Sequence, residues 1–171
     1  DLAFARELAE ENGCGGFEFE TDSLRQAALW EARHHLAYAF LHGYPGKKAI
    51  TTDVCLPLSE LAGAIEHARG LLEKTGMVGG IVGHVGDGNF HSLLMIDPDQ
   101  PEEMQQAEAV NAEIVRYALS RGSTCTGEHG VGLGKAKYQR MEHGNALDVM
   151  YAVKRALDPN NILNPGKIFV F

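Results

Sequence analysis

The sequence has few cysteines, little positive charge and no long hydrophobic run, and each shortage excludes a class of protein. Its 171 residues contain three isolated cysteines, Cys14, Cys55 and Cys125, which argues against a disulfide framework and favours a reducing compartment such as the cytoplasm. The net charge of −8 argues against a nucleic-acid partner, because phosphate binding needs a basic surface. No apolar run approaches the ~20 residues of a membrane-spanning helix, and no signal-peptide pattern is present.

The composition that remains is typical of a soluble globular protein. Hydrophobic residues make up 44% of the chain and charged residues 22%, and the length allows one domain with a sizeable core and an appended segment. The first residue is Asp1 rather than methionine, and a helical pattern begins directly after it. We therefore expect the chain to be part of a longer protein.

The most informative stretch is Gly-His-Val-Gly-Asp-Gly-Asn-Phe-His, at positions 83–91. Apolar residues precede and follow it. Asp87-Gly88 at its centre is a strong hairpin signal, because both central positions of such a tight turn need positive φ. The pattern predicts two antiparallel strands, at 78–85 and 89–96, joined by a two-residue turn.

In that hairpin His84 lies opposite His91, and strand alternation places Asn89 on the same face. Two imidazoles and an amide would then converge at one point of the sheet surface. Neutral imidazole is the commonest metal ligand, so we favour a metal or catalytic role over two incidental surface histidines. A divalent ion would need a further ligand, typically a carboxylate.

Glu128 is the best candidate for that carboxylate, since it follows a predicted strand of the same sheet and lies in a glycine-rich segment at 127–134. The alternative is that this segment is only a helix-entry loop, in which an acid suits the helix N-terminus. In an extended backbone the neighbouring His129 would point in the other direction, towards substrate, as an acid or base. Arg33 could hold a carboxylate through a bidentate fork, although most helix arginines are only solvated.

Periodicity along the chain predicts an α+β fold. Residues 49–127 follow the order β-α-β-β-α-β, a ferredoxin-like split βαβ antiparallel sheet with helices on one face. Residues 1–48 are expected to hold cap or linker helices and a short strand, and residues 128–171 a glycine-rich loop, a C-terminal helical segment and a tail that ends in a short strand. The expected helices are at 2–12, 23–41, 57–76, 101–122, 135–142 and 145–157. The expected strands, including the two of the hairpin, are at 17–20, 50–56, 78–85, 89–96 and 123–126.

The length of the fourth predicted strand decides whether Glu128 can reach the two histidines. A full-length strand at 123–126 would carry Glu128 to the sheet end away from the hairpin turn, so a shared site requires that strand to be short. Asp53 and Cys55, on the first strand of the sheet, are interpreted as packing and hairpin support rather than as catalytic residues.

Three motifs resemble the C-terminal half of FAD-linked oxidases: His-Val-Gly-Asp-Gly-Asn-Phe-His at 84–91, Thr-Cys-Thr-Gly-Glu-His-Gly at 124–130 and Leu-Asn-Pro-Gly-Lys at 163–167. These oxidases are the relatives of cytochrome-type D-lactate dehydrogenase and of the glycolate oxidase flavin subunit within the vanillyl-alcohol oxidase superfamily. Two more motifs, Leu-Trp-Glu-Ala-Arg-His at 29–34 and Thr-Asp-Val-Cys-Leu-Pro-Leu-Ser at 52–59, are similar to the D-lactate dehydrogenase branch. The resemblance extends over nearly the whole chain.

The resemblance implies a role for several of these residues. It implies a divalent metal (zinc, manganese or iron), a base that removes the substrate hydroxyl proton, side chains that hold the substrate, and an asparagine that returns to the flavin. The residues that match are His84, His91 and Glu128 for the metal, His129 for the base, Asn89 for the substrate, Arg33 and Lys48 for the substrate carboxylate, and Asn164 for the flavin.

The implied activity is FAD-dependent oxidation of a small D-2-hydroxy acid, with hydride transfer to the flavin. Ala37 stands where some D-2-hydroxyglutarate enzymes of the family carry a hydroxyl residue, which favours D-lactate, oxidised to pyruvate, over D-2-hydroxyglutarate. A relative that oxidises D-2-hydroxyglutarate or glycolate stays an alternative. The N-terminal FAD-binding domain lies outside these residues, so we expect it to make most FAD contacts and the fragment to be inactive alone.

The implied partners are that FAD-binding domain, a small 2-hydroxy acid and an electron acceptor such as cytochrome or quinone. The implied location is the cytoplasm or the periphery of the inner membrane. A homodimer is a further implied partner arrangement. The alternative of another class is a non-catalytic metal-binding or interaction module of the same fold. A metal-dependent hydrolase fits less well, because nothing resembles its nucleophile arrangement.

Overall fold

The computed structural model describes residues 1–169, with the side chain of Ala37 excepted. The chain divides into two units, Asp1–Gly43 and Tyr44–Phe171, and each is described by itself. Within the described residues, no helix is both long and apolar enough to cross a membrane. The three-part division of the chain at residues 48 and 127 stays a prediction.

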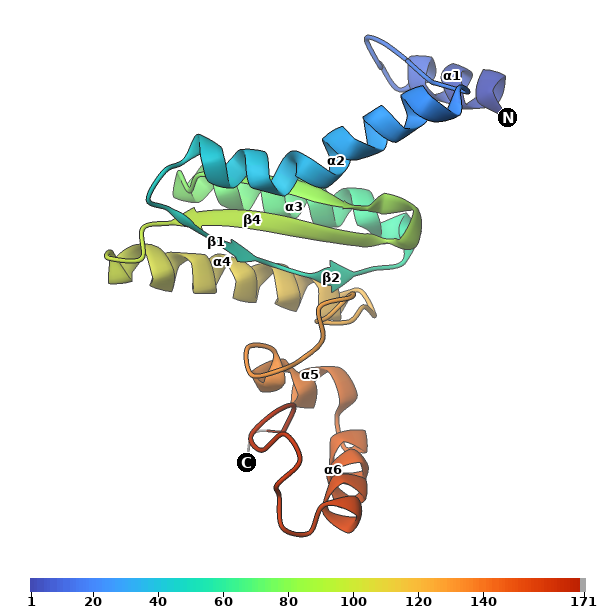
Figure 1. Ribbon diagram of the computed structural model, residues 1–171. Coiled ribbons are helices and arrows are strands. Elements are labelled where there is room, and N and C mark those ends of the chain that lie inside the picture. The colour runs from blue at the N-terminus through green and yellow to red at the C-terminus, as the bar shows by residue number, and fades with distance from the viewer. Residues whose placement is uncertain (170–171) are drawn as a thin grey trace. The chain divides into compact units, whose positions relative to one another are not determined.

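The first unit consists of α1 (Leu2–Glu11) and α2 (Ser23–Gly43), both close to their expected limits (Figure 1). Asp22 caps α2, because its carboxylate accepts hydrogen bonds from the amides of Leu24 and Arg25, each at 3.1 Å. The start of this helix therefore follows from its sequence.

The strand expected at 17–20 is wrong. Among the described residues of the first unit this stretch has no strand partner, and its two phenylalanine rings lie beside the Arg6 guanidinium, at 5.8 Å for Phe17 and 5.5 Å for Phe19. The alternation of aromatic and acidic residues therefore reflects packing against a cation rather than a sheet.

The second unit is built around β4 (Asn89–Ile96), the central strand of an antiparallel sheet (Figure 1). Three further strands pair with β4, one along one edge and two in succession along the other. They are β3 (Gly79–His84) on the first edge, and β1 (Lys48–Thr51) followed by β2 (Val54–Cys55) on the second.

The strand expected at 50–56 is interrupted at Thr52 and Asp53, between β1 and β2. Thr52 still donates its amide hydrogen to the Ser92 carbonyl at 3.0 Å, so the chain stays beside β4 through the interruption. The interruption matters for the site, because the Asp53 side chain is fully buried there.

The hairpin between β3 and β4 also differs from the prediction. His84 lies opposite Asn89 and His91 lies opposite Val82, because a 3-10 turn at Val85–Asp87 (η1) lengthens the connection. The two-residue turn is therefore wrong. The pairing is shifted by two residues, and since side chains alternate with a period of two, His84, Asn89 and His91 still share a face.

Gly88 explains the longer connection. It has a φ of 74°, its carbonyl accepts a hydrogen bond from the Leu56 amide at 2.9 Å, and a Cβ at this position would lie 2.0 Å from the Leu56 carbonyl oxygen. The end of the hairpin is thus bonded to the chain beyond β2. Local turn preferences do not include such an interaction, and only glycine fits it.

Two helices, α3 (Leu58–Thr75) and α4 (Pro101–Ser120), pack against each other and against β4, close to their expected limits. α3 ends at Gly76, which takes a φ of 65° as its C-cap. Alternate residues of β4 face these helices, so the opposite face of the strand carries His91. The core side chains of the three elements are Leu61, Ala64, Ala68, Phe90, Leu94, Ile96, Ala107, Val110, Ile114, Val115 and Ala118.

The fourth strand of the expected sheet is reduced to a single bridge between Thr124 and Cys55. The α+β class is confirmed, whereas the described residues do not show the ferredoxin-like arrangement. The segment is short enough to meet the condition set for Glu128, which a full-length strand would have carried away from the hairpin turn.

Beyond the glycine-rich loop the chain is helical, as expected, and then turns back. The tail is tied to the loop by a hydrogen bond from the Ile168 amide to the Gly132 carbonyl at 2.9 Å, and within the described residues it forms no strand. The helices are the 3-10 turn η2 (Ala136–Tyr138), α5 (Gln139–His143) and α6 (Ala146–Leu157).

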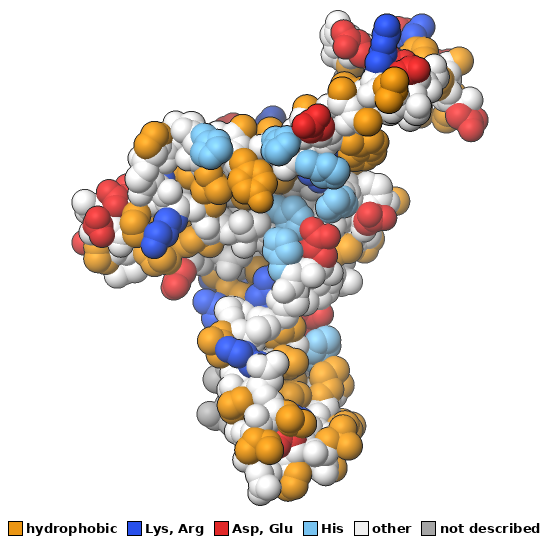
Figure 2. Space-filling view, in the orientation of Figure 1, with side chains coloured by type: hydrophobic (Ala, Val, Ile, Leu, Met, Phe, Trp, Pro, Cys, Tyr) orange, Lys and Arg blue, Asp and Glu red, His pale blue; other side chains and the backbone are white. Residues whose placement is uncertain are grey.

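This C-terminal part has an apolar surface. Figure 2 shows hydrophobic side chains spread over it. Large exposed apolar patches are typical of surfaces that another protein part covers. The exposed apolar side chains of α6 and the tail include Val149, Met150, Val153, Leu157, Ile162 and Leu163.

Candidate functional site

Four predicted site residues meet around one carboxylate oxygen in the second unit. Glu128 Oε1 lies 3.0 Å from His91 Nε2, 3.6 Å from His84 Nε2 and 3.8 Å from His129 Nε2. Ligand atoms of His84, His91 and Glu128 all lie within 4.8 Å of one another. The residues expected to bind metal and the expected base therefore form one cluster.

The hydrogen bonding of His91 defines which of its nitrogens is free. Its Nδ1 lies 3.2 Å from the Thr52 carbonyl oxygen and 3.6 Å from Asp53 Oδ1. Since a carbonyl oxygen only accepts, Nδ1 is the donor of this contact, and Nε2 is the nitrogen that faces Glu128. An imidazole nitrogen and a carboxylate oxygen 3.0 Å apart need a proton or a cation between them.

Asp53 holds the loop that carries Glu128 and His129. Its fully buried carboxylate accepts hydrogen bonds from the amides of Gly127, Glu128 and His129, at 2.9, 3.1 and 3.0 Å, and from Lys135 Nζ at 3.0 Å. Burial raises the pKa of Asp53. The hydrogen bonds from the His129 amide and from Lys135 outweigh this effect and hold the pKa well below its usual range.

Glu128 and His129 do not diverge as an extended backbone would require. The three successive amides converge on one carboxylate, so the chain curves around it. As a result both side chains reach His91, and the His129 ring stacks on the His91 ring with centroids 4.8 Å apart and planes 8° apart. The expectation that neighbouring residues would point apart is corrected by this curvature.

Gly127 allows that close approach. A Cβ at this position would lie 2.0 Å from Asn89 Nδ2 and 2.6 Å from Asp53 Oδ1, distances that no side chain can occupy. The loop backbone therefore packs directly on the Asn89 amide and the Asp53 carboxylate.

Asn89 lies beside this cluster with an unpaired acceptor. Its Nδ2 donates to Asp53 Oδ1 at 3.2 Å, while its Oδ1 is buried and has no hydrogen-bond partner in the part of the chain that the structure describes. Leaving such an oxygen unpaired costs about 1–3 kcal/mol. This is the kind of group that a hydrogen-bonding ligand would satisfy.

The comparison with known proteins identifies the family of this chain. The sequence matches the family described as FAD linked oxidases, C-terminal domain, over residues 1–168. The chain belongs to this family. The resemblance found in the motifs is thereby confirmed.

Curated relatives of this FAD-linked oxidase domain are similar over most of its length. It is 42% identical over 168 residues to a probable mitochondrial D-lactate dehydrogenase of Danio rerio, covering 98% of this chain and 34% of that protein. It is 41% identical over 164 residues to the mitochondrial cytochrome-type D-lactate dehydrogenase of Arabidopsis thaliana, covering 95% and 29%. A glycolate oxidase subunit of Bacillus subtilis is 40% identical over 143 residues, covering 83% and 30%.

The chain therefore spans about a third of the length of these relatives. Among solved structures, the 4-ethylphenol oxidase of Gulosibacter chungangensis superposes with a TM-score of 0.60 at 20% identity, over 89% of this chain and 32% of that one. This similarity concerns the fold alone.

Two of the family-implied residues in the second unit, Lys48 and Asn164, are not part of the cluster. Lys48 pairs with Ile96, five positions along β4 from His91, which corresponds to roughly 17 Å at the rise of a strand. Arg33 belongs to α2 in the first unit. Asn164 is exposed in the tail, with a φ of 52°, and no described contact joins it to the cluster. Their roles stay predictions.

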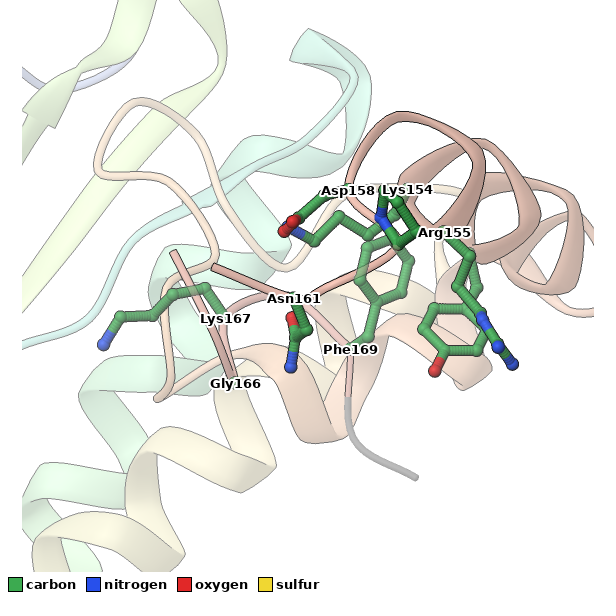
Figure 3. Close-up of a pocket in the computed structure, with 9 residues that line it drawn as sticks. Lys154, Arg155, Asp158, Asn161, Gly166, Lys167 and Phe169 are labelled. Carbon is green, nitrogen blue, oxygen red and sulfur yellow. The ribbon is translucent and has the colours of Figure 1, made fainter. Parts of the chain in front are cut away.

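Two cavities are lined by residues outside the cluster. One of about 440 Å³ in the first unit is lined by Arg33 together with Trp30 and neighbouring residues. The other, of about 420 Å³, lies in the C-terminal part, where Lys154 and Asp158 lie together at the end of α6 and the Lys167 side chain points away from them (Figure 3). Neither cavity contains a residue of the cluster.

Sequence reasoning missed how Asp53 and Lys135 contribute to the site. The sequence pattern favours a supporting role for Asp53 and indicates none for Lys135. The available signal is a polar residue in the middle of a β-rich run, Thr51-Thr52-Asp53-Val54, since aspartate is unfavourable in strands.

Proposed function

We propose that this chain is the substrate-side part of an FAD-dependent D-2-hydroxy-acid dehydrogenase, most consistent with oxidation of D-lactate to pyruvate. Family membership and the names of the D-lactate dehydrogenase relatives support the reaction class. The chain corresponds to about a third of those proteins, so the activity belongs to a longer protein. Ala37 is the sequence feature that favours D-lactate over D-2-hydroxyglutarate.

The observation that carries the proposal is the approach of His91 Nε2 to Glu128 Oε1 at 3.0 Å, with the other nitrogen of His91 facing a carbonyl. Nitrogen and carboxylate ligands lie about 2.0–2.2 Å from zinc, and tetrahedral ligands at that distance are about 3.4 Å apart. The separations of Glu128 Oε1 from His91 and His84, 3.0 and 3.6 Å, are close to that value. The donor set suits zinc, manganese or iron.

When bound, such an ion would polarise the substrate hydroxyl, and the flavin would accept the hydride. The chain's own residues bind, orient and deprotonate the substrate. His129 takes the hydroxyl proton on Nε2, the nitrogen that faces Glu128 at 3.8 Å. Asn89, whose Oδ1 has no partner among the described residues, contacts the substrate beside these groups.

Three further residues complete the proposed binding of substrate and cofactor. The resemblance assigns the substrate carboxylate to Arg33 and Lys48, and a carboxylate fixed in this way would place the α-carbon for hydride transfer. Asn164, in the tail, contacts the flavin. These assignments depend on the family resemblance and on the rest of the protein.

The partners of this chain follow from the same proposal. An N-terminal FAD-binding domain of the same protein would make most FAD contacts and cover the exposed apolar surface of α6 and the tail. Electrons would pass to a cytochrome or quinone, at the periphery of the inner membrane or in the cytoplasm, and a homodimer is an option. The two D-lactate dehydrogenase relatives are named as mitochondrial proteins.

The reaction is tested with the full-length protein. Flavin absorbance is followed anaerobically after addition of D-lactate, L-lactate, glycolate or D-2-hydroxyglutarate, before and after metal chelation. We expect rapid bleaching by D-lactate that chelation abolishes. Bleaching by glycolate or D-2-hydroxyglutarate alone would show that the substrate is that acid rather than D-lactate. No bleaching by any of the four acids would refute the reaction class.

The ligand set is tested by metal content and by direct titration with zinc and manganese. The double variant His84→Ala, His91→Ala should lose the bound ion, whereas His143→Ala should keep it. His143 is a suitable control, because it forms a similar pair with a carboxylate, Glu142, at 3.7 Å, and belongs to neither group of candidate ligands. Unchanged binding in the double variant would remove both histidines from the ligand set.

One further variant distinguishes the proposed enzyme from a non-catalytic metal-binding module. In a holoenzyme that carries His129→Ala, the proposal expects flavin reduction to slow by about 100- to 10,000-fold, the usual contribution of an acid or base. Full activity in this variant would remove His129 from the chemistry.

A further inference from the structure

The Asp53 carboxylate joins four separate segments of the second unit. It lies in the interruption between β1 and β2, and it accepts hydrogen bonds from Asn89 Nδ2 in β4, from the loop amides at 127–129 and from Lys135 Nζ. Thr126 Oγ1 adds a further bond at 3.2 Å. The side chain is fully buried, and that of Lys135 is nearly so.

Asp53 is itself a possible metal ligand by distance, since it forms a group with His91 and His129. Its hydrogen bonds argue against that role. Oδ1 accepts from Asn89 and Glu128, and Oδ2 accepts from Thr126, the three loop amides and Lys135. A carboxylate offers about four lone-pair directions, so none is left for an ion.

We propose that Asp53, paired with Lys135, is a positioning residue that sets the metal affinity of the neighbouring cluster and the placement of His129. The inference rests on the proposed metal site and assigns a role to two residues outside it. Asp53 fixes the backbone of Glu128 and His129, and its Oδ1 lies 3.6 Å from His91 Nδ1, on the side of the ring away from Glu128. It therefore acts on three members of the cluster at once.

The negative charge of Asp53 is what the arrangement needs, because all of its partners are donors. In Asp53→Asn one terminal oxygen becomes an NH₂ group, which would face amide hydrogens and the Lys135 ammonium. Part of the loop must then move away, and Glu128 moves with it. Loss of partners that orient metal ligands typically lowers metal affinity about 10- to 100-fold.

The chain offers a matched control in Asp158. This carboxylate is also nearly buried, accepts hydrogen bonds from two successive amides, Ile162 and Leu163, each at 2.9 Å, and pairs with Lys154. Figure 3 shows Asp158 and Lys154 at the end of α6, and neither belongs to a group of candidate metal ligands. Asp158→Asn thus removes the same chemistry from a different place.

The experiment titrates the full-length protein with Mn²⁺ and measures free Mn²⁺ by electron paramagnetic resonance, with a urea unfolding curve for each variant. Asp53→Asn and Lys135→Met should weaken Mn²⁺ binding about 10-fold or more. Asp158→Asn should bind Mn²⁺ as the wild type does, even where its unfolding midpoint falls. If Asp53→Asn does not fold, Lys135→Met decides, because it keeps the carboxylate and its amide bonds.

Wild-type affinity in both Asp53→Asn and Lys135→Met would overturn the inference while leaving the proposed metal site intact. An equal loss of affinity in Asp158→Asn would also overturn it, since the effect would then be one of general stability. A wild-type protein that binds no Mn²⁺ or Zn²⁺ would refute the metal site itself, and the positioning role with it.

Discussion

Replacing Gly127 by alanine should separate the glycine-rich loop from Asn89 and Asp53. The added Cβ would start 2.0 Å from Asn89 Nδ2, and ordinary van der Waals contact begins at 3.4 Å, so the two atoms must move apart by 3.4 − 2.0 = 1.4 Å. Asn89 and Asp53 are both buried, which prevents either from turning aside. Overpacking of this kind costs about 1–3 kcal/mol.

The displacement also weakens hydrogen bonds. A shift of that size breaks the bond from the Gly127 amide to Asp53, now 2.9 Å, and the one from Asn89 to Asp53, now 3.2 Å. At about 1 kcal/mol for each bond, the total loss is about 3–5 kcal/mol. For a protein of this size, 1 kcal/mol corresponds to about 2–4 °C, so the melting temperature should fall by about 6–20 °C.

Calorimetry and urea unfolding of Gly127→Ala measure this loss, with Gly134→Ala as the control. Gly134 lies in the same loop, has no positive φ, and a Cβ there would meet nothing within 4 Å. The control should therefore change stability by less than about 0.5 kcal/mol. Equal stability of the two variants would refute the close packing of the loop on Asn89 and Asp53.

The Lys154 ammonium holds the pKa of Asp158 below its usual range, so the stabilising contribution of this carboxylate is complete above its unfolded pKa of about 4 and is lost as the pH falls through the folded value. Between pH 6 and pH 2 the urea midpoint of Asp158→Asn should fall less than that of the wild type. An equal fall in both proteins would contradict the ion pair. Burial raises the pKa of Cys125 to about 12, so iodoacetamide at pH 8 should modify the exposed Cys14 and spare Cys125, as read by mass spectrometry; equal labelling would disprove the burial of that thiol. Phe90 is buried in the core, and Phe90→Ala should cost about 3–5 kcal/mol in chemical unfolding, whereas a loss below 1 kcal/mol would be inconsistent with that position.

The helices of the core could be predicted from the sequence because their signals are local. α3 has an apolar stripe at helical spacing and a glycine, Gly76, at its end, and both appear in the structure as expected. The hairpin register could not be predicted in the same way. It depends on Gly88 meeting the backbone of Leu56, and turn preferences within the hairpin contain no information on that contact.

In the candidate site, too, residues with a local sequence signal could be predicted and long-range contacts could not. His84, His91, Glu128 and His129 could be proposed from residue type and motif, and the structure brings them together. The contribution of Asp53 could not, because its partners are the amides of residues 74 to 76 positions later in the chain. A buried carboxylate that binds backbone amides has no sequence pattern of its own.

The hydrogen bond from Ile168 to Gly132 has a practical consequence for work on this protein. It links the last described turn of the chain to the loop that carries Glu128 and His129. A shortened protein that ends before Ile168 would lose this bond, and an affinity tag fused at that point would disturb it, so either change would alter the position of the loop. Preparations meant for metal or substrate measurements should keep the natural tail at least through Phe169 and carry their tag at the other end.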